Sequence, residues 1–370
     1  MKKNIVFFNG FFLPHLGGVE RYTNNLAKYL KKKYNIFIVT TNVPNSIEKE
    51  VIDGVTVYRL PVYNIFANRY PILKKNKVYF RIINEIKKME ISHIICNTRY
   101  YQTSILGAKL ARQMNVDLSI IDHSSSHVSI GNKILDFFGS IYENHITRKI
   151  LKSSPRFYGV SKRCNEWLKY YNIDASGVFY NSIDKIESPD KKIEDIIHIG
   201  YVGRVIPEKG IENLIKAYYV LKEKYNIDLT VVGDGPQLKY LKNTYPEVTY
   251  TGAVNHDSVI ENMKKFDIFV HPSMYPEGLP TSILEAGMMK CAVVATDRGG
   301  TTEVISNSNL GIIVKENVQD LIDKLDSLLS DKKKILNFQN SIYNEICKKF
   351  TWEKTAMFVE EELKKYEKNC

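Results

Sequence analysis

Short apolar runs alternate with longer segments of helical periodicity along the whole chain, and this alternation starts twice. It is the pattern of βαβ units around a parallel sheet, and two starts in 370 residues predict two such sheets. The strands predicted in the first half are 5–8, 36–40, 55–60, 94–97, 118–122 and 157–160. Those predicted in the second half are 196–203, 228–233, 248–252, 267–272 and 292–297. We therefore expect an α/β protein whose ligand lies in a cleft between two doubly wound sheets.

A charged segment with a proline and no apolar periodicity, residues 184–195, predicts a boundary between two domains. The expected domains are residues 1–185 and 186–349. The segment 350–368 has apolar residues at spacings of three and four, which predicts an amphipathic helix that packs on a domain already formed. These apolar residues are Trp352, Ala356, Val359 and Leu363.

The net positive charge lies in the first half of the chain, which has far fewer acidic residues than the second half. The net charge is +11 overall, but residues 1–190 hold 28 Lys and Arg against 15 Asp and Glu, a net charge of +13. Residues 191–370 hold 24 against 26, a net charge of −2. A genome-wide compositional bias would affect both halves alike. The asymmetry predicts an anionic partner for the first half, which is a membrane surface, a polyanionic acceptor or nucleic acid.

Other features narrow the class of protein. The five cysteines are scattered and form no CxxC pair, which favours a reducing compartment over a disulfide framework or a thiolate zinc site. No apolar run approaches the roughly 18–20 residues of a membrane-spanning helix. The apolar run at 5–8 lacks a signal-peptide cleavage site and is interpreted as a strand. We expect a soluble or peripheral protein.

The strongest indication of a site is the segment 275–305, where Glu277 and Glu285 lie eight positions apart. A turn after Glu277 leads into a helix predicted to begin near Ser282, with Thr281 or Ser282 as its N-cap. The free amides and the positive dipole end of such a helix favour a diphosphate or sugar hydroxyls. Glu285, one turn into the helix, is placed to accept hydrogen bonds from a ribose diol. Two solvated glutamates are the alternative interpretation.

Two further loops have the composition of anion sites. Arg204 and Lys209 follow the predicted strand 196–203, where a guanidinium fork and an ammonium can hold phosphate oxygens; ordinary surface cations are the alternative. Gly17 and Gly18 open a helix after the first strand and either let backbone approach a ligand closely or form a plain tight turn. The chain lacks GxGxxG at this turn and at VVGDGP, so a nicotinamide or flavin cofactor is not expected.

His123 follows the predicted strand 118–122 and is flanked by Asp122 and three serines. Active-site groups of α/β proteins lie at such a strand end. A structural histidine that caps the next helix fits the same residues, and His127 is a second candidate.

Residues 68–88 interleave aromatic residues with Lys and Arg and predict a basic helix. Such a helix either lies on anionic lipid or packs its apolar side, Phe80, Ile83 and Ile86, into the core, and we favour the core for that side. The membrane-binding face is predicted to include Lys74, Lys75, Lys77 and Arg81.

Six motifs together resemble retaining glycosyltransferases of family 4, which have the GT-B fold. They are GGVER at 17–21, YGVSK at 158–162, YNSIDK at 180–185, the GR…EKG loop at 203–210, VVGDGP at 231–236 and the two-glutamate segment 275–285. The resemblance covers essentially the whole chain and is looser between residues 60 and 150, where acceptor recognition would lie. It implies two Rossmann-like domains and a last helix that crosses back to the N-terminal domain.

The resemblance also implies roles for individual residues. The C-terminal domain would bind a nucleotide-sugar, with Arg204 and Lys209 on its diphosphate and Glu285 on its ribose. Glu277 would meet the sugar hydroxyls, and Gly278 and Leu279 would belong to the same nucleotide-sugar site. Gly17 and Gly18 would approach the diphosphate from the N-terminal domain, and His123 would lie near the transferred sugar. The chain reads EGLP where many members read EGFG, so the sugar's identity does not follow from this motif.

The expected function is therefore a retaining hexosyltransferase that uses a nucleotide-sugar, expected to be a UDP-sugar. The expected acceptor is lipid-linked or a polysaccharide, in cell-surface glycan synthesis at the cytoplasmic face of the cell membrane. The chain holds no Asp-x-Asp pair and no metal-ligand spacing, so neither a metal nor a cofactor is expected. The alternatives are a GT-B enzyme such as a UDP-N-acetylglucosamine 2-epimerase and a nucleic-acid-binding protein, although no known nucleic-acid-binding motif is present.

Overall fold

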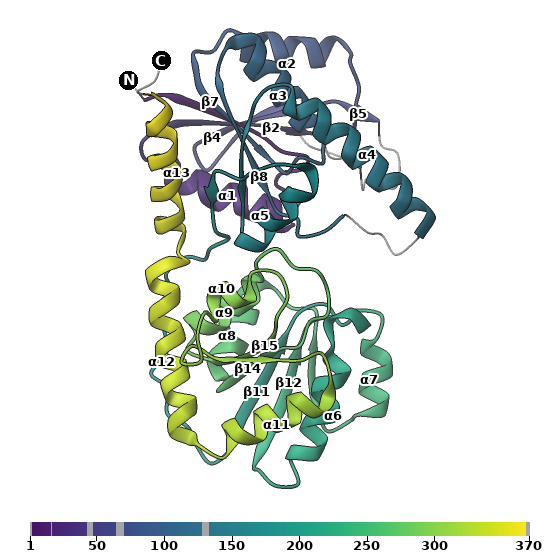
Figure 1. The fold of residues 1–370 in the computed structure, drawn as a ribbon, viewed down its shortest axis with the longest axis vertical. Helices are drawn as coiled ribbons and strands as arrows, with labels where there is room; N and C mark the ends of the chain where they lie inside the picture. The colour runs from purple at the N-terminus through teal and green to yellow at the C-terminus, as the bar shows by residue number, and fades with distance from the viewer. Residues whose placement is uncertain (1, 16, 43–46, 64–69, 128–132, 368–370) are drawn as a thin grey trace. The chain divides into compact units, whose positions relative to one another are not determined.

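The computed structural model describes residues 2–15, 17–42, 47–63, 70–127 and 133–367. It divides the chain into two compact units (Figure 1): unit 1 is Met1–Asn181 with Trp352–Cys370, and unit 2 is Ser182–Thr351. The predicted boundaries, 185/186 and 349/350, differ from these divisions by a few residues. The segment 184–195 belongs to unit 2, where the Lys191 ammonium donates to the carbonyls of Lys264 at 2.5 Å and Phe266 at 2.7 Å.

Unit 1 is a sheet with helices on both faces. Its strands are β1 (Asn4–Phe8), β2 (Asn35–Thr41), β3 (Lys49–Ile52), β4 (Val55–Leu60), β5 (Val62–Tyr63), β6 (Ile72–Leu73), β7 (Ile91–Asn97), β8 (Asp117–Asp122), β9 (Arg156–Gly159) and β10 (Gly177–Val178). Its helices are α1 (Gly18–Leu30), α2 (Lys77–Lys87), α3 (Gln102–Met114), α4 (Lys133–Leu151), α5 (Lys162–Leu168), the 3₁₀ turn η1 (Lys169–Tyr171) and α13 (Trp352–Glu367).

The main sheet of unit 1 has the order β10-β9-β8-β7-β1-β2-β4-β3, and only the β3–β4 pair is antiparallel. Alternate side chains of β1 point to opposite faces. Val6 and Phe8 pack against α2, α3 and α4, whereas Ile5 and Phe7 pack against α1, α5 and α13. Because β1 lies between β2 and β7, the chain turns in opposite directions on its two sides, and this switch point is where such sheets bind ligands.

The C-terminal helix α13 packs on unit 1, as its apolar spacing and the family resemblance predict. Trp352, Ala356, Val359 and Leu363 are all buried in the core formed with α1. The Trp352 ring meets the Tyr22 ring edge to face, with centroids 5.0 Å apart. Lys368, the last residue of the predicted helix, lies outside the described residues.

The basic segment is helical only from Lys77, and its apolar side differs from the prediction. Tyr79, Ile82, Ile83 and Ile86 are buried, whereas Phe80 is 53% exposed. The predicted stripe was one residue out of phase at its start, because Tyr79 is amphipathic and suits a core position as well as Phe80 does. Residues 68–69 of the predicted segment lie outside the described residues.

Unit 2 is a parallel sheet with helices. Its strands are β11 (Ile197–Val202), β12 (Ile227–Val232), β13 (Thr249–Gly252), β14 (Ile268–His271), β15 (Ala292–Thr296) and β16 (Ile312–Val314). Its helices are the 3₁₀ turn η2 (Pro207–Lys209), α6 (Ile211–Leu221), α7 (Leu238–Thr244), α8 (His256–Lys265), α9 (Thr281–Met288), α10 (Thr301–Val304), α11 (Val318–Leu329) and α12 (Lys332–Lys349).

The strand order of unit 2 is β13-β12-β11-β14-β15-β16, and every pair is parallel. β11 therefore has β12 on one side and β14 on the other, which makes the β11/β14 edge the switch point of this sheet. The prediction of an α/β chain with two doubly wound sheets is confirmed. Within the described residues, the helices include none whose length and apolarity would let it cross a membrane.

Candidate active site

The loops that follow β11 and β14 meet at the switch point of unit 2. Gly210 has a positive φ of 67°, and a Cβ there would lie 2.1 Å from the Pro272 carbonyl oxygen, so only glycine permits this approach. The Met274 N–H donates to the Glu208 carbonyl at 2.8 Å. The two strongest sequence motifs of unit 2 are therefore parts of one surface.

Lys209 and Glu277 form the centre of this surface. The Lys209 ammonium donates to Glu277 Oε1, which also accepts from the Ser273 hydroxyl at 3.1 Å and lies 3.6 Å from His271 Nε2. Both side chains of the pair are mostly buried, with exposed fractions of 12% and 16%. Burial alone would raise the pKa of Glu277, but His271 and Lys209 outweigh it and lower the pKa to about 2. Glu277 is thus an ionised acceptor at neutral pH.

Arg204 lies on the rim of the same surface. Its guanidinium carbon is 5.9 Å from the centroid of the Tyr275 ring, and Lys209 Nζ is 5.4 Å from the same centroid. The residue is exposed, while its carbonyl accepts from the Tyr201 hydroxyl at 2.9 Å. The two predicted cations therefore share one aromatic neighbour, and Arg204 keeps its charged end accessible to an anion.

The start of α9 differs from the prediction in one detail. The N-cap is Pro280, whose φ of −64° is fixed by its ring, and Thr281 is already the first helical residue. Gly278 and the buried Leu279 lie just before it, and the Gly278 carbonyl accepts from the Gly300 N–H at 2.7 Å. Proline supplies no hydroxyl to cap the helix, so the first amides of α9 have no side-chain acceptor at the N-cap position.

Glu285 lies one turn into α9 and is mostly buried, with 16% of its side chain exposed. Its Oε1 is 3.7 Å from Nε2 of His256, the first residue of α8. The sequence did not indicate His256, His271 or Tyr275 as site residues.

The predicted histidine of unit 1 lies at the other switch point, where β1, β7 and β8 end. His123 Nε2 is 3.3 Å from Asn97 Oδ1, and its ring meets the Tyr22 ring edge to face at 4.8 Å. The Asn97 amide donates to Asn9 Oδ1 and to the Thr23 hydroxyl, which leaves its Oδ1 as the acceptor for His123. Burial lowers the pKa of His123 to about 3, so the ring is neutral at neutral pH and acts as a hydrogen-bond donor.

Gly17 and Gly18 begin α1, with Gly17 as N-cap in an extended conformation. A Cβ on Gly17 would lie 2.4 Å from Oε2 of Glu20, and the Glu20 carboxylate accepts hydrogen bonds from the backbone N–H groups of Gly17 and Glu20. Burial raises the pKa of Glu20, although these bonds and His15, 3.6 Å away, partly offset the effect. Glu20 thus acts as the acidic half of a capping box at the helix start.

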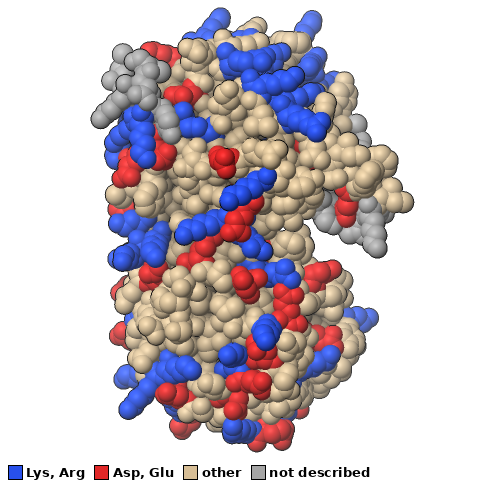
Figure 2. Space-filling model, in the orientation of Figure 1, with Lys and Arg blue, Asp and Glu red and all other residues tan. Residues whose placement is uncertain are grey.

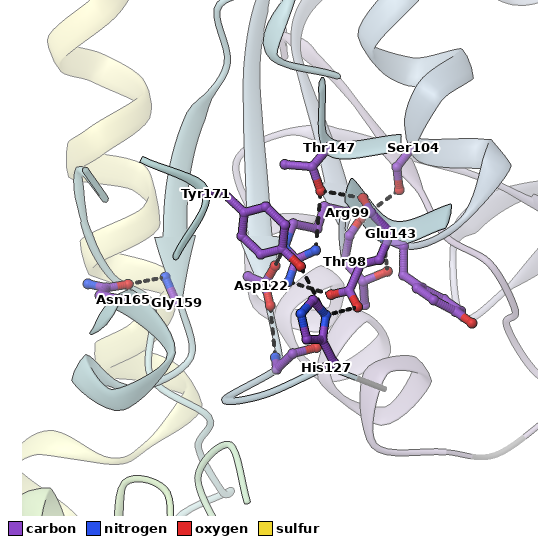
Figure 3. A network of polar contacts seen from close by, with 12 residues as sticks. Thr98, Arg99, Ser104, Asp122, His127, Glu143, Thr147, Gly159, Asn165 and Tyr171 are labelled. Atoms are coloured by element: carbon purple, nitrogen blue, oxygen red, sulfur yellow. Dashed lines mark hydrogen bonds and ion pairs between the residues drawn. The ribbon is translucent and has the colours of Figure 1, made fainter. Parts of the chain in front are cut away.

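A buried ionic network holds the ends of β7 and β8 to α4 (Figure 3). Arg99 Nε lies 2.7 Å from Asp122 Oδ2, and Arg99 Nη2 lies 2.6 Å from Glu143 Oε1. Glu143 also pairs with His127 Nδ1 at 2.8 Å, and the Arg99 guanidinium stacks over the Tyr171 ring at 4.1 Å. Burial raises the pKa of Asp122 despite the adjacent guanidinium. The second histidine candidate, His127, is therefore part of a network that fixes α4.

Comparison with known proteins identifies the family to which the chain belongs. The family model described as Glycosyl transferases group 1 matches residues 182–345, and the one described as Glycosyltransferase Family 4 matches residues 16–185. An uncharacterized glycosyltransferase of Methanocaldococcus jannaschii is 30% identical over 380 residues, covering 96% of each chain. The phosphatidylinositol N-acetylglucosaminyltransferase GPI3 subunit of Saccharomyces cerevisiae is 24% identical, covering 94% of this chain and 80% of its own.

Among solved structures, HepE of Anabaena in complex with UDP has the same fold. It superposes with a TM-score of 0.73 at 17% identity and covers 99% of this chain and 100% of its own. The two doubly wound units, the returning C-terminal helix and these relatives lead to one conclusion: the chain belongs to the glycosyltransferases and has the GT-B fold.

Proposed function

We propose that the protein is a retaining, metal-independent glycosyltransferase that moves a hexose-type sugar from a UDP-sugar to a lipid-linked or polysaccharide acceptor in cell-surface glycan synthesis. The observation that carries the donor assignment is the Lys209–Glu277 pair at the β11/β14 switch point, with Arg204 beside it. Two cations and the start of α9 suit a diphosphate, and an ionised carboxylate suits sugar hydroxyls.

The proposed roles follow from charge and access. Lys209 and Arg204 stabilise the negative charge that develops on the departing diphosphate, and this charge is largest in the transition state. Glu277 accepts hydrogen bonds from the sugar and holds the Lys209 ammonium in place through their ion pair. Glu285 accepts from the ribose, and Gly278 and Leu279 contribute the backbone between the two glutamates.

Departure of the diphosphate leaves an oxocarbenium-like sugar, as in glycoside hydrolysis. The acceptor hydroxyl then attacks from the face that the diphosphate leaves, and its proton passes to a diphosphate oxygen. The C–O bond to the diphosphate breaks and the C–O bond to the acceptor forms on the same face, which retains the anomeric configuration. In unit 1, His123 is proposed to act on the transferred sugar as a neutral hydrogen-bond donor. Gly17 and Gly18 of the same unit are proposed to let the backbone approach the diphosphate.

The donor and acceptor classes draw support from the relatives. HepE of Anabaena was solved with UDP, and the yeast relative is named for transfer to phosphatidylinositol. The absence of an Asp-x-Asp pair from the sequence favours a reaction without a divalent metal. The family models and relatives are glycosyltransferases, which favours transfer over the 2-epimerase and nucleic-acid alternatives.

We further propose that unit 1 contacts the inner face of the cell membrane. Lys74, Lys75, Lys77 and Arg81 are all exposed at or near α2. Figure 2 shows Lys and Arg side chains gathered over the end of unit 1 where α2 lies. Basic residues near an anionic surface contribute about 1 kcal/mol each.

A donor screen with purified protein tests the donor site. Release of nucleoside diphosphate is measured across UDP-, GDP- and ADP-sugars for the wild type and for Lys209→Ala, Arg204→Ala and Glu285→Ala. Each substitution should lower the rate by roughly 30- to 1000-fold, or about 2–4 kcal/mol. Lys216→Ala, which removes an exposed lysine of α6, is the control. Wild-type turnover in a folded Lys209→Ala protein would exclude the proposed site.

The metal-free, retaining course has its own test. Transfer is assayed in excess EDTA, and the product anomer is determined by NMR. Activity should persist and the configuration should be retained. Activity that is lost on chelation and restored by Mg²⁺ or Mn²⁺ would contradict metal independence. A product with inverted anomeric configuration would contradict the retaining mechanism.

A further inference from the structure

One face of α4 carries a cluster of large apolar side chains in contact with solvent. Ile134, Phe137, Phe138 and Ile141 are 70%, 62%, 62% and 49% exposed. They recur at spacings of three and four residues and so lie on one side of the helix. Single exposed apolar residues are ordinary on protein surfaces, but a contiguous apolar patch marks an interaction site.

The opposite side of α4 fixes the helix to unit 1. Glu143 and Thr147 are buried and contact the Arg99 guanidinium (Figure 3). Ile146 and Ile150 are buried in the core. The ion pair and the core contacts set the rotation of the helix about its axis. The apolar cluster is therefore presented outward by a fixed element.

The outward face continues as a basic surface toward the end of the helix. His145, Arg148, Lys149 and Lys152 are all exposed. They follow Ile141 at spacings of three and four residues, on the same side. The acidic residues between 134 and 152 are Asp136 and Glu143, seven residues or about two turns apart, and so both lie on the side that holds Arg99.

We infer that this face of α4, defined by the apolar cluster and the basic residues that follow it, docks on an anionic lipid bilayer. The apolar half enters the boundary between headgroups and acyl chains, and the basic half contacts lipid phosphates. An amphipathic surface with aromatic and aliphatic residues beside Lys and Arg is the composition that binds such interfaces. In Figure 2 the projecting end of α4 is mostly tan, the colour of residues other than Lys, Arg, Asp and Glu.

Charge favours lipid over a second copy of the chain. In a two-fold pair the same face would meet itself, so the cations of one copy would meet cations or apolar groups of the other. The face supplies no carboxylate between residues 134 and 152 to neutralise them, as Asp136 and Glu143 lie on the other side. Lipid phosphates supply that negative charge. The inference rests on the proposed function only in that it brings unit 1 to the membrane where a lipid-linked acceptor lies.

Vesicle flotation tests the surface. The full chain and the variant Phe137→Ser/Phe138→Ser/Ile141→Ser are floated with vesicles of phosphatidylcholine and phosphatidylglycerol. The control, Met357→Ser/Phe358→Ser, removes apolar side chains of similar exposure, 46% and 50%, from α13. The α4 variant should bind about ten-fold or more weakly, and the control should bind as the wild type does. Equal binding by all three proteins would overturn the inference.

Insertion has a spectroscopic readout. In a Phe138→Trp protein, phosphatidylglycerol vesicles should shift the tryptophan emission to shorter wavelength beyond the wild-type change, and brominated acyl chains should quench it. If the vesicles shift the emission of the Phe138→Trp protein no more than that of the wild type, insertion is excluded.

The basic half of the face has a separate test. Arg148→Gln/Lys149→Gln/Lys152→Gln should weaken vesicle binding at low salt and reduce the salt dependence of binding. An unchanged salt dependence would show that these residues do not contact the lipid.

Two further measurements separate the competing outcomes. Sedimentation velocity without lipid should show the same state of association for the wild type and the apolar variant. A wild-type dimer that this variant converts to monomer, with vesicle binding unchanged, would assign the face to a second copy instead. If vesicle binding behaves as expected but no nucleotide-sugar donor is turned over, the proposed function fails and the lipid surface stands.

Discussion

At the scale of single residues, the ionisation of Glu277 links the proposed donor site to stability. Its pKa is lowered from 4.5 to about 2, so its contribution is present above pH 4.5 and is lost as the pH falls toward 2. The shift corresponds to about 3 kcal/mol. We predict that the difference in unfolding free energy between the wild type and Glu277→Gln, measured with urea, falls to about half between neutral pH and about pH 3.

The exposed Glu208 of the neighbouring loop provides the control for this measurement. Glu208→Gln should differ little from the wild type in unfolding free energy, since surface substitutions usually stay within about 0.5 kcal/mol. A Glu277→Gln difference that stays constant across the same range would show that the carboxylate is not held ionised by its neighbours.

His123 also loses stability as the pH falls, but at higher pH than Glu277 does. Burial lowers its pKa to about 3, while an unfolded histidine titrates near 6.5. The unfolded chain therefore takes up this proton first as the pH falls, and stability decreases from pH 6.5 toward pH 3. At about pH 5 the loss from His123 is about 2 kcal/mol. We predict that His123→Gln, which can still donate to Asn97, removes this loss between pH 7 and about pH 5.

His93 is the control that separates the effect of titration from a role in catalysis. Burial, with a smaller effect of Arg156, lowers the pKa of His93 to about 3 as well. His93→Gln should flatten the pH dependence of unfolding as His123→Gln does, but only His123→Gln should also lower kcat. Equal kcat values for both variants would leave His123 with a structural role alone.

At the scale of elements, local patterns were sufficient for most strands and for α13. Val55–Leu60 is β4 with its predicted bounds, and the four apolar positions of α13 are buried. No helix was predicted where α4 lies, because apolar residues occur on both of its sides. Ile134, Phe137, Phe138 and Ile141 are exposed while Ile146 and Ile150 are buried, so the sequence of α4 contains no single apolar stripe.

Only part of the candidate site was predicted, because some of its contacts join segments that are distant along the chain. Glu277, Lys209 and Arg204 stand in recognisable motifs, but their partners His271 and Tyr275 depend on strand order. β11 and β14 are neighbours although β12 and β13 separate them along the chain, and no local pattern encodes that pairing. The proline N-cap of α9 was missed because a hydroxyl residue, Thr281, follows it directly.

The returning helix α13 yields a stability prediction. Trp352 is 2% exposed and packs against Tyr22 and the α1 side of the core. Trp352→Ala should lower the unfolding free energy of unit 1 by about 3–5 kcal/mol, because it removes apolar contacts and leaves a cavity. Phe358→Ala, on the same helix but 50% exposed, should change it by less than about 0.5 kcal/mol. Similar losses in both variants, measured by urea unfolding, would contradict this packing.

At the scale of the whole molecule, the chain is two units with separate cores and an uneven distribution of charge. The clusters that stabilise unit 1 lie on both faces of its sheet, and the main cluster of unit 2 joins β11, β12, β14 and β15 to α6 and α11. The basic excess lies in the half that forms most of unit 1, whereas the predicted donor residues Arg204, Lys209, Glu277 and Glu285 all lie in unit 2. Membrane contact and nucleotide binding are thus proposed for different units.

This division can be measured with the two native tryptophans, because Trp167 and Trp352 both belong to unit 1. Tryptophan fluorescence therefore follows the unfolding of unit 1, while far-ultraviolet circular dichroism follows both units. A ligand stabilises the unit that binds it by about 2.7 kcal/mol at a hundred times its Kd. For a unit the size of Ser182–Thr351 this raises the midpoint by about 5–10 °C. We predict that UDP shifts a circular dichroism transition by this amount and leaves the tryptophan transition in place, with or without EDTA. A tryptophan transition that moves with UDP while the remaining transition does not would place the nucleotide on unit 1 and contradict the assignment to Arg204 and Lys209.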